Sequence, residues 1–69
     1  MPISGRQAIK ILQKHGFEVS RQRGSHVVLV LESRNGKRTA VIPNHRELKK
    51  GTLRSIARQS GINRKELGL

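Results

Sequence analysis

The fold is decided by one stretch, residues 26–43, which reads HVVLVLESRNGKRTAVIP. Two runs of apolar and β-branched residues lie on either side of Asn35 and Gly36. Asn-Gly between such runs is the strongest short-range signal of a β-hairpin with a two-residue loop. The stretch therefore predicts two antiparallel strands, one over residues 26–32 and the other over residues 37–43.

The predicted hairpin sorts its side chains onto two faces, because successive residues of a strand point in opposite directions. With that loop, His26 lies opposite His45. One face carries His26, Val28, Val30, Thr39 and Val41, and the other carries Val27, Leu29, Leu31, Ala40 and Ile42. The second set is uniformly apolar, so we expect helices to cover it. His26 then lies on the open face, at the same end as Arg21 and Arg23.

Helices are predicted on both sides of these strands. Ser4 and Gln7 have the spacing of a capping box, and Gly16 supplies the residue that ends the first helix. Thr52 is the expected N-cap of the second helix, which Gly61 ends. The side chains at helical spacing, which we expect to be buried, are Ala8, Ile11, Leu12, Leu53, Ile56 and Ala57.

Shorter segments complete the predicted fold. Residues 17–20 alternate apolar and polar side chains, which predicts a first strand. His15 is expected to pack or cap at the end of the first helix, and Asn63 and Glu66 are expected to cap a last turn. The order α-β-β-β-α indicates an α+β fold, with two helices on one face of a three-stranded antiparallel sheet. The length predicts a single domain over residues 1–69.

The chain is strongly basic. Its 69 residues include 15 Lys and Arg against four Glu and no Asp, for a formal net charge of +11. A folded domain with this imbalance attracts polyanions, because each neutralised phosphate releases condensed counterions. A surface made basic for solubility usually contains more interspersed acids, and neither predicted helix has the aromatic-rich face of a membrane-binding helix. The composition therefore favours nucleic acid as the partner.

The composition also limits the compartment and the chemistry. The absence of Cys excludes a disulfide framework and a thiolate zinc site. No apolar run approaches the ~20 residues of a membrane span, and the N-terminus lacks the apolar core of a signal peptide. We expect a cytoplasmic protein without a cofactor. Four scattered Glu without Asp also argue against a two-metal nuclease.

His26 is the candidate for chemistry. It follows Gly24 and Ser25 at the start of the most apolar run of the chain. A histidine at a strand end is often an ordinary polar residue. In this cationic setting, however, one general base suffices to cleave RNA, because the 2′-OH lies beside the scissile phosphorus and nearby Lys or Arg can stabilise the transition state. DNA lacks that internal nucleophile, so the residues point to RNA.

Four motifs are spread along the chain. They are GSH at residues 24–26, PNH at 43–45, ELKKGTLRSI at 47–56 and QSGI at 59–62. With the opening Ser4-Gly5 and the Gly16-Phe17 helix exit, they resemble the HicA toxins, small mRNA interferases also called YcfA-like proteins. The resemblance covers nearly the whole chain. GSH alone is a weak signal, but GSH followed at this distance by GTLR is specific.

This resemblance implies a double-stranded-RNA-binding-domain-like fold and a toxin that cleaves mRNA without a metal. It also implies that His26 is the catalytic residue and that a HicB-type antitoxin, encoded beside the toxin, inhibits it. Two roles stay open for His45, which is either an N-cap-like loop residue or a second proton-transfer group. The alternative to the enzyme is a non-catalytic RNA-binding module.

The remaining candidate residues have three expected roles. Gly24 and Ser25 position the backbone before His26. RNA is expected to contact the cations Arg21, Arg23, Lys49, Lys50, Arg54 and Arg58. The antitoxin is expected to bind an apolar strip on the open face that consists of Val28, Val30 and Val41. The alternative occupant of this strip is a second copy of the chain, which would make a homodimer.

Overall fold

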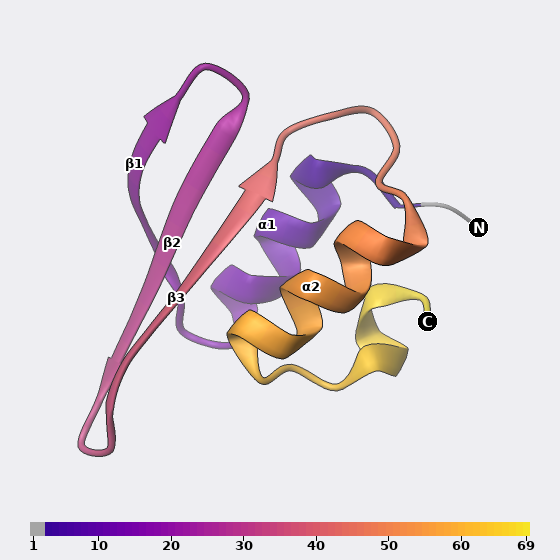
Figure 1. Ribbon diagram of the computed structural model, residues 1–69. Helices are drawn as coiled ribbons and strands as arrows, with labels where there is room; N and C mark the ends of the chain where they lie inside the picture. Colours follow the sequence, from indigo (N-terminus) through magenta and orange to yellow (C-terminus); the bar gives the residue numbers. More distant parts are fainter. Residues whose placement is uncertain (1–2) are drawn as a thin grey trace.

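The computed structural model describes residues 3–69 and confirms the predicted order α-β-β-β-α (Figure 1). Its elements are α1 (Gly5–Lys14), β1 (Glu18–Arg23), β2 (His26–Ser33), β3 (Gly36–Pro43), α2 (Lys50–Ser60) and a short 3-10 helix, η1 (Arg64–Leu67). The strands form one antiparallel sheet in the order β1-β2-β3, and both α-helices lie against the same face. The domain predicted over residues 1–69 includes residues 1 and 2, which lie outside the described residues.

Local signals define both ends of α1, as predicted. Ser4 Oγ accepts a hydrogen bond from Gln7 N at 3.1 Å, and Gln7 Oε1 accepts one from Ser4 N at 2.8 Å, which completes the capping box. At the other end Phe17 N donates to Leu12 O at 3.1 Å across Gly16, whose φ is 95°. This is the hydrogen bond of a Schellman motif, which turns the chain sharply out of α1 into β1.

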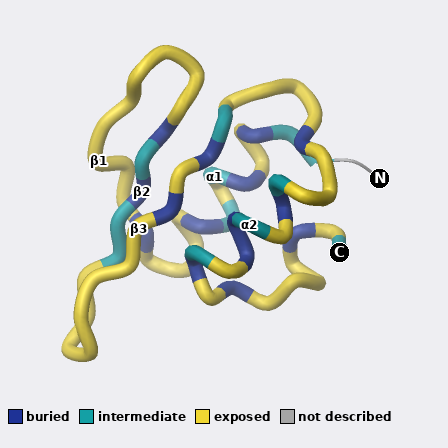
Figure 2. The backbone as a smooth tube through the Cα atoms, viewed as in Figure 1, coloured by how far each residue is buried: buried dark blue, intermediate teal, exposed yellow. Residues whose placement is uncertain are grey.

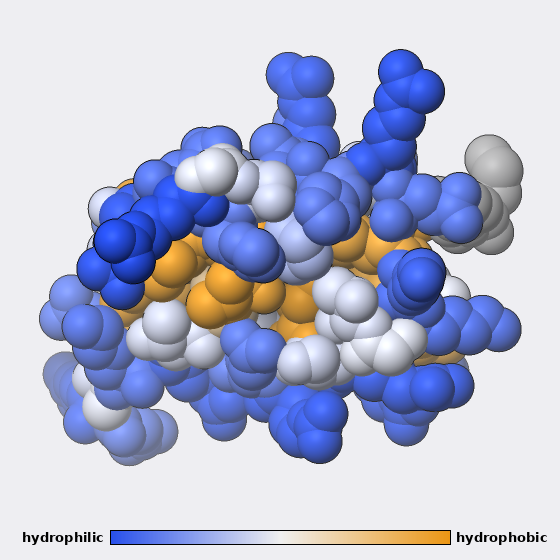
Figure 3. All heavy atoms as spheres, turned by 45° about the horizontal axis from the view of Figure 1, so that its top comes forward, coloured by the Kyte–Doolittle hydropathy of each residue, from blue (hydrophilic) through white to orange (hydrophobic). Residues whose placement is uncertain are grey.

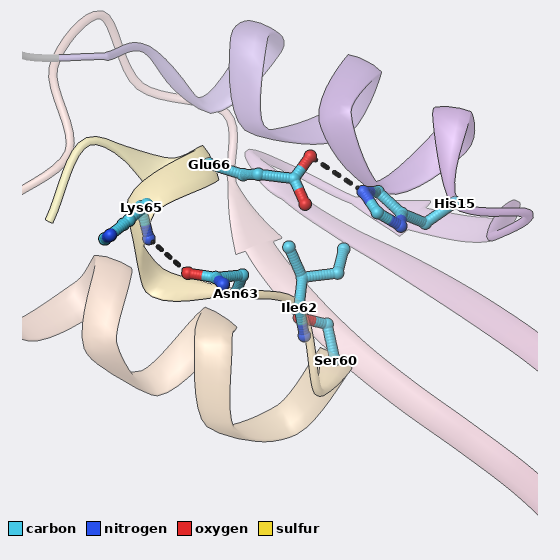
Figure 4. Close-up of polar contacts among 6 residues, drawn as sticks. All are labelled: His15, Ser60, Ile62, Asn63, Lys65 and Glu66. Carbon is cyan, nitrogen blue, oxygen red and sulfur yellow. Dashed lines mark hydrogen bonds and ion pairs between the residues drawn. The ribbon is translucent and has the colours of Figure 1, made fainter.

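His15 occupies the C-cap position of α1, but it is exposed and does not pack in the core. Its Nε2 lies 2.8 Å from Glu66 Oε1 of η1 (Figure 4). The Glu66 side chain therefore joins α1 to η1, and the capping role expected for it is not observed. Asn63 caps η1 as predicted, since its Oδ1 accepts a hydrogen bond from Lys65 N at 2.9 Å.

The hairpin turn between β2 and β3 is not the predicted one. Ser33 pairs with Gly36, so the turn residues are Arg34 and Asn35 rather than Asn35 and Gly36. A two-residue loop at Asn-Gly needs positive φ at both positions. Among residues 3–69 no residue other than glycine has positive φ, whereas Gly36 has a φ of 120° directly after the turn. Gly36 therefore adopts its positive φ directly after the two-residue turn and not, as expected, within it.

This turn shifts the pairing of β2 and β3 by two residues. His26 lies opposite Pro43, so the predicted pairing of His26 with His45 is wrong. A shift of two residues leaves every side chain on its predicted face, because the side-chain period of a strand is two. The assignment of faces is therefore confirmed although the register is not.

The core lies between the sheet and the two helices (Figure 2). The sheet contributes the inward residues Val27, Leu29, Ala40 and Ile42, and the helices contribute Ala8, Leu12, Leu53, Ile56 and Ala57. Phe17, Leu48, Ile62 and Leu67 close the core around its rim. Ile11 is only half-buried. Within residues 3–69, neither helix combines the length and the apolar character that crossing a membrane requires.

Two predicted boundaries are wrong. β1 does not cover residues 17–20; it starts after the buried Phe17 and continues to Arg23, with an irregularity in the pairing between Val19 and Arg21. Such a bulge bends and twists a strand.

The second wrong boundary is the start of α2. This helix has Lys49 as its N-cap and not Thr52, although Lys49 makes no side-chain capping bond. Leu53 N donates to Lys49 O at 3.0 Å in the first turn of the helix, directly after the buried Leu48. The local capping preference of Thr52 therefore does not decide where α2 starts.

Candidate functional site

A tight turn presents His26. Gly24 and Ser25 form the two-residue loop between β1 and β2, since Arg23 pairs with His26. Gly24 has a φ of 56°, and Ser25 has no positive φ. Positive φ at the first loop residue alone is the pattern of a type II′ turn, which places glycine at that position. The turn makes His26 the first residue of β2, exposed on the open face of the sheet.

A second segment, the loop after β3, is bonded to this turn. Asn44 N donates to Ser25 O at 2.6 Å, and His45 Nε2 lies 3.3 Å from Ser25 Oγ. His45 is exposed, like His26. The structure therefore brings His45 next to the residue that precedes His26, through a loop contact and not through strand pairing.

The N-terminus of α1 supports the same loop. Gly5 N donates to His45 O at 2.8 Å, and Gly5 is buried. A Cβ on this residue would lie 2.2 Å from Pro43 O and 2.7 Å from Asn44 Cα, which are both backbone atoms. Only glycine allows α1 to approach this closely. The sequence reasoning assigned no role to Gly5, although a glycine at the first position of a helix was a usable signal.

Two pairs of cations lie on or next to the segments that carry His26 and His45. Arg21 and Arg23 lie on the open face, because Arg21 pairs with Val28 and Arg23 pairs with His26. Lys49 and Lys50 start α2, close in sequence to the loop that holds His45, and both are exposed. The surface at the end with the β1-β2 turn is mostly hydrophilic, with apolar atoms visible between the polar side chains (Figure 3).

Arg54 and Arg58 lie elsewhere. They line a hollow together with Arg38 of β3 and Arg64 of η1. Arg38 pairs with Leu31 and therefore belongs to the helix side of the sheet, opposite to the face of His26. Arg38 and Arg64 were not predicted from the sequence to belong to a site. The sequence did carry a signal for Arg38, because residues 38, 40 and 42 alternate along the strand and Arg38 therefore points to the same face as Ala40 and Ile42.

The apolar strip exists on the open face. Val28 of β2 lies opposite Val41 of β3, and Val30 follows on the same side of β2. Val41 is 38% exposed, and the other two are half-buried. Arg21, the β1 partner of Val28, places a cation at its border. The strip is thus a solvent-facing apolar surface with a basic margin.

Within residues 3–69, no three His, Cys, Asp or Glu side chains are grouped so that they could hold a metal ion. The four Glu residues lie apart, on β1, β2, the loop after β3 and η1.

The chain matches a model of a protein family. The model described as the HicA toxin of bacterial toxin-antitoxin systems matches residues 5–62, which include the β1-β2 turn, the loop after β3 and all of α2. No curated protein matches the chain.

Proposed function

The chain belongs to the HicA toxin family and is therefore a toxin of a toxin–antitoxin system, and from this premise we propose its reaction and its partner. We propose that it is an endoribonuclease that cleaves mRNA without a metal, with His26 as the general base. We further propose that it acts in the cytoplasm, where a HicB-type antitoxin inhibits it.

The observation that carries this proposal is the position of His26. The ring is exposed on the open face of the sheet, at a turn that hydrogen bonds tie to the loop after β3. A neutral imidazole there can take the proton of a ribose 2′-OH as the oxygen attacks the adjacent phosphorus. Arg21 and Arg23 on the same face can stabilise the negative charge that develops on the phosphate.

The reaction also requires a proton donor. As the 2′-oxygen bonds to phosphorus, the bond to the 5′-oxygen breaks, and that oxygen takes up a proton. The products are a 2′,3′-cyclic phosphate and a 5′-hydroxyl end. We propose His45 as the second proton-transfer group, because its Nε2 lies 3.3 Å from Ser25 Oγ, next to His26 in the chain. Ser25 then positions the His45 ring, and Gly24 provides the turn that brings the two histidines to one end.

The RNA-binding surface is proposed to include cations of β1 and of α2 with its N-cap. Arg21 and Arg23 contact phosphates next to the cleaved bond, and Lys49 and Lys50 contact phosphates beyond the His45 loop. Arg54 and Arg58 lie farther away, on the helix side of the sheet. The excess of cations makes this binding sensitive to salt.

The antitoxin is proposed to bind over the apolar strip of Val28, Val30 and Val41. A partner there covers His26 and competes with RNA for Arg21 and Arg23, and acidic residues on it would complement the basic margin. Hydrogen exchange of the mixed proteins tests this surface. Protection of residues 26–30 is expected, whereas protection centred on α1 rules out inhibition by occlusion. A dimer of the toxin alone that buries the strip would indicate a second copy as its occupant.

The catalytic proposal is tested by incubating the protein with purified mRNA in EDTA. The parent protein should produce fragments, and His26→Ala should lower the cleavage rate by about 10²–10⁴-fold, the usual contribution of a general base. His15→Ala is the matched control, because His15 is also exposed but lies at the far end of α1. Retarded but intact RNA with the parent protein would favour the non-catalytic binding module. An unchanged rate in folded His26→Ala would show that His26 is not the base.

A further inference from the structure

Four arginines from three separate parts of the fold line one hollow on the helix side of the sheet. Arg38 comes from β3, Arg54 and Arg58 come from α2, and Arg64 comes from η1. Ala57, Gly61 and Ile62 provide the rest of the lining. Building on the proposed ribonuclease activity, we propose that this arginine hollow binds phosphodiester groups of the RNA strand, away from the bond that is cleaved.

The guanidinium of Arg38 already contacts the end of α2. Its Nη1 donates to Gln59 O at 3.4 Å, in the last turn of α2. Gly61 allows this approach, since a Cβ there would lie 3.0 Å from Arg38 Cζ and Nη1. The Gln59 side chain is itself fixed, because its Oε1 accepts from Val41 N and its Nε2 donates to Ser55 Oγ, both at 2.9 Å. A guanidinium that already lies against α2 loses less conformational freedom when an anion binds than a fully free one.

The positive charge of the hollow is not neutralised within the protein. None of the residues that line it is acidic. Glu66 is the acid of η1, but its carboxylate is bound to His15 on the opposite side of η1 from α2 (Figure 4). Among residues 3–69 that contact is the one between a basic and an acidic side chain, so Arg64 and the other three guanidiniums have no carboxylate partner. An anion that enters the hollow relieves the repulsion among four like charges.

Phosphodiester groups fit this surface better than an isolated small anion does. A guanidinium binds two phosphate oxygens at once, and arginines spaced i and i+4 along a helix, such as Arg54 and Arg58, can contact successive phosphates. The apolar lining, Ala57 and Ile62, offers a surface for a ribose or a base between phosphates. A polyanion of this kind also matches the net charge of +11.

The hollow is too far from His26 to contact the phosphate that is cleaved. Leu31, the partner of Arg38, lies five residues beyond His26 on β2, which is roughly 17 Å along the strand, and the two side chains point to opposite faces. The hollow therefore contributes to binding only when the RNA extends well beyond the cleavage site. The contribution of the hollow to RNA affinity should therefore depend on the length of the RNA.

The experiment measures the binding of 2′-O-methyl RNA, which lacks the nucleophile and is not cleaved, by fluorescence anisotropy at several salt concentrations. Oligonucleotides of roughly 4 and roughly 16 nucleotides span the usual site sizes for single strands. The variant is Arg58→Gln with Arg64→Gln. The matched control, Arg34→Gln with Lys65→Gln, removes the same charge from exposed residues that do not line the hollow. Thermal unfolding verifies that both variants are folded.

The hollow variant should bind the long RNA on the order of tenfold more weakly at low salt, with the slope of log affinity against log salt reduced by about 1.4, or 0.7 for each lost phosphate contact. The short RNA should bind as to the parent, and the control should change little with either RNA.

Equal losses in the variant and the control would overturn the proposal, because net charge would then explain both. Unchanged binding of the long RNA would also overturn it. Cleavable mRNA, tested in parallel with the parent protein, reports separately on the ribonuclease activity. Its failure to be cut would contradict that activity without affecting the binding result.

Discussion

Replacing Gly5 with alanine should loosen the contact between α1 and the loop after β3 that carries His45. The added Cβ would lie 2.2 Å from Pro43 O and 3.0 Å from His45 N. Ordinary contact requires the helix and the loop to separate by roughly 1 Å, and backbone atoms cannot rotate out of the way as a side chain can. The separation also stretches the hydrogen bond from Gly5 N to His45 O, now 2.8 Å. Overpacking of this kind typically costs about 1–3 kcal/mol.

Urea unfolding of Gly5→Ala should therefore give a free energy of unfolding about 1–3 kcal/mol lower than that of the parent. In a domain of this size, each kcal/mol lowers the melting temperature by roughly 4–8 °C. Gly51→Ala is the control, because Gly51 lies in α2 with nothing within 4 Å of its would-be Cβ. It should stabilise the protein by about 0.5–1 kcal/mol through helix propensity. If both variants shift stability in the same direction by similar amounts, the close approach at Gly5 is not what constrains this position.

Three further substitutions test other contacts. Ser4→Ala removes the capping box of α1 and should lower the free energy of unfolding by about 1 kcal/mol, measured by urea unfolding. Glu66→Gln removes the carboxylate charge from the exposed contact with His15 and should cost less than about 1 kcal/mol, measured by urea unfolding. When His15 is protonated, the difference from the parent should shrink as salt is added, and a larger cost that salt does not change would contradict a contact between surface charges. Gln59→Ala leaves the N–H of Val41 free at the edge of the sheet and should cost about 1 kcal/mol. The free N–H on this edge strand should also promote self-association, which sedimentation experiments detect. A fully monomeric variant would show that the Gln59 side chain does not prevent pairing of this edge with another chain.

Much of the fold could be predicted because its signals are local. The capping box of Ser4 and the helix exit at Gly16 involve residues close in sequence, and both were found where predicted. The two faces of the hairpin were also predicted correctly, because strand alternation survives a shift of two residues. The predicted register was wrong, because Asn35-Gly36 is compatible with two different turns. The sequence alone does not determine which position takes positive φ.

The candidate site was harder to predict because its contacts join distant residues. His26 could be singled out from its motif and its cationic setting. The contacts of Gly5 with His45 and of His45 with Ser25 depend on how the loop after β3 folds back, which no local propensity describes. Arg64 is a similar case, because it reaches the arginine hollow only through the position of η1.

The contacts that link Gly5, Ser25 and His45 also order events during synthesis. Ser25 lies 20 positions from both Gly5 and His45, which are 40 positions apart from each other. The inner face of the sheet is fully covered only when Leu53 and Ile56 of α2 pack on it beside α1. A nascent chain that has just exposed His26 lacks both the loop that braces the turn and the helix that stabilises the strands. Contacts at such separation form late, since the loops between them must close first. A ribosome translating this message would therefore finish most of the chain before the two histidines proposed for catalysis reach their final arrangement.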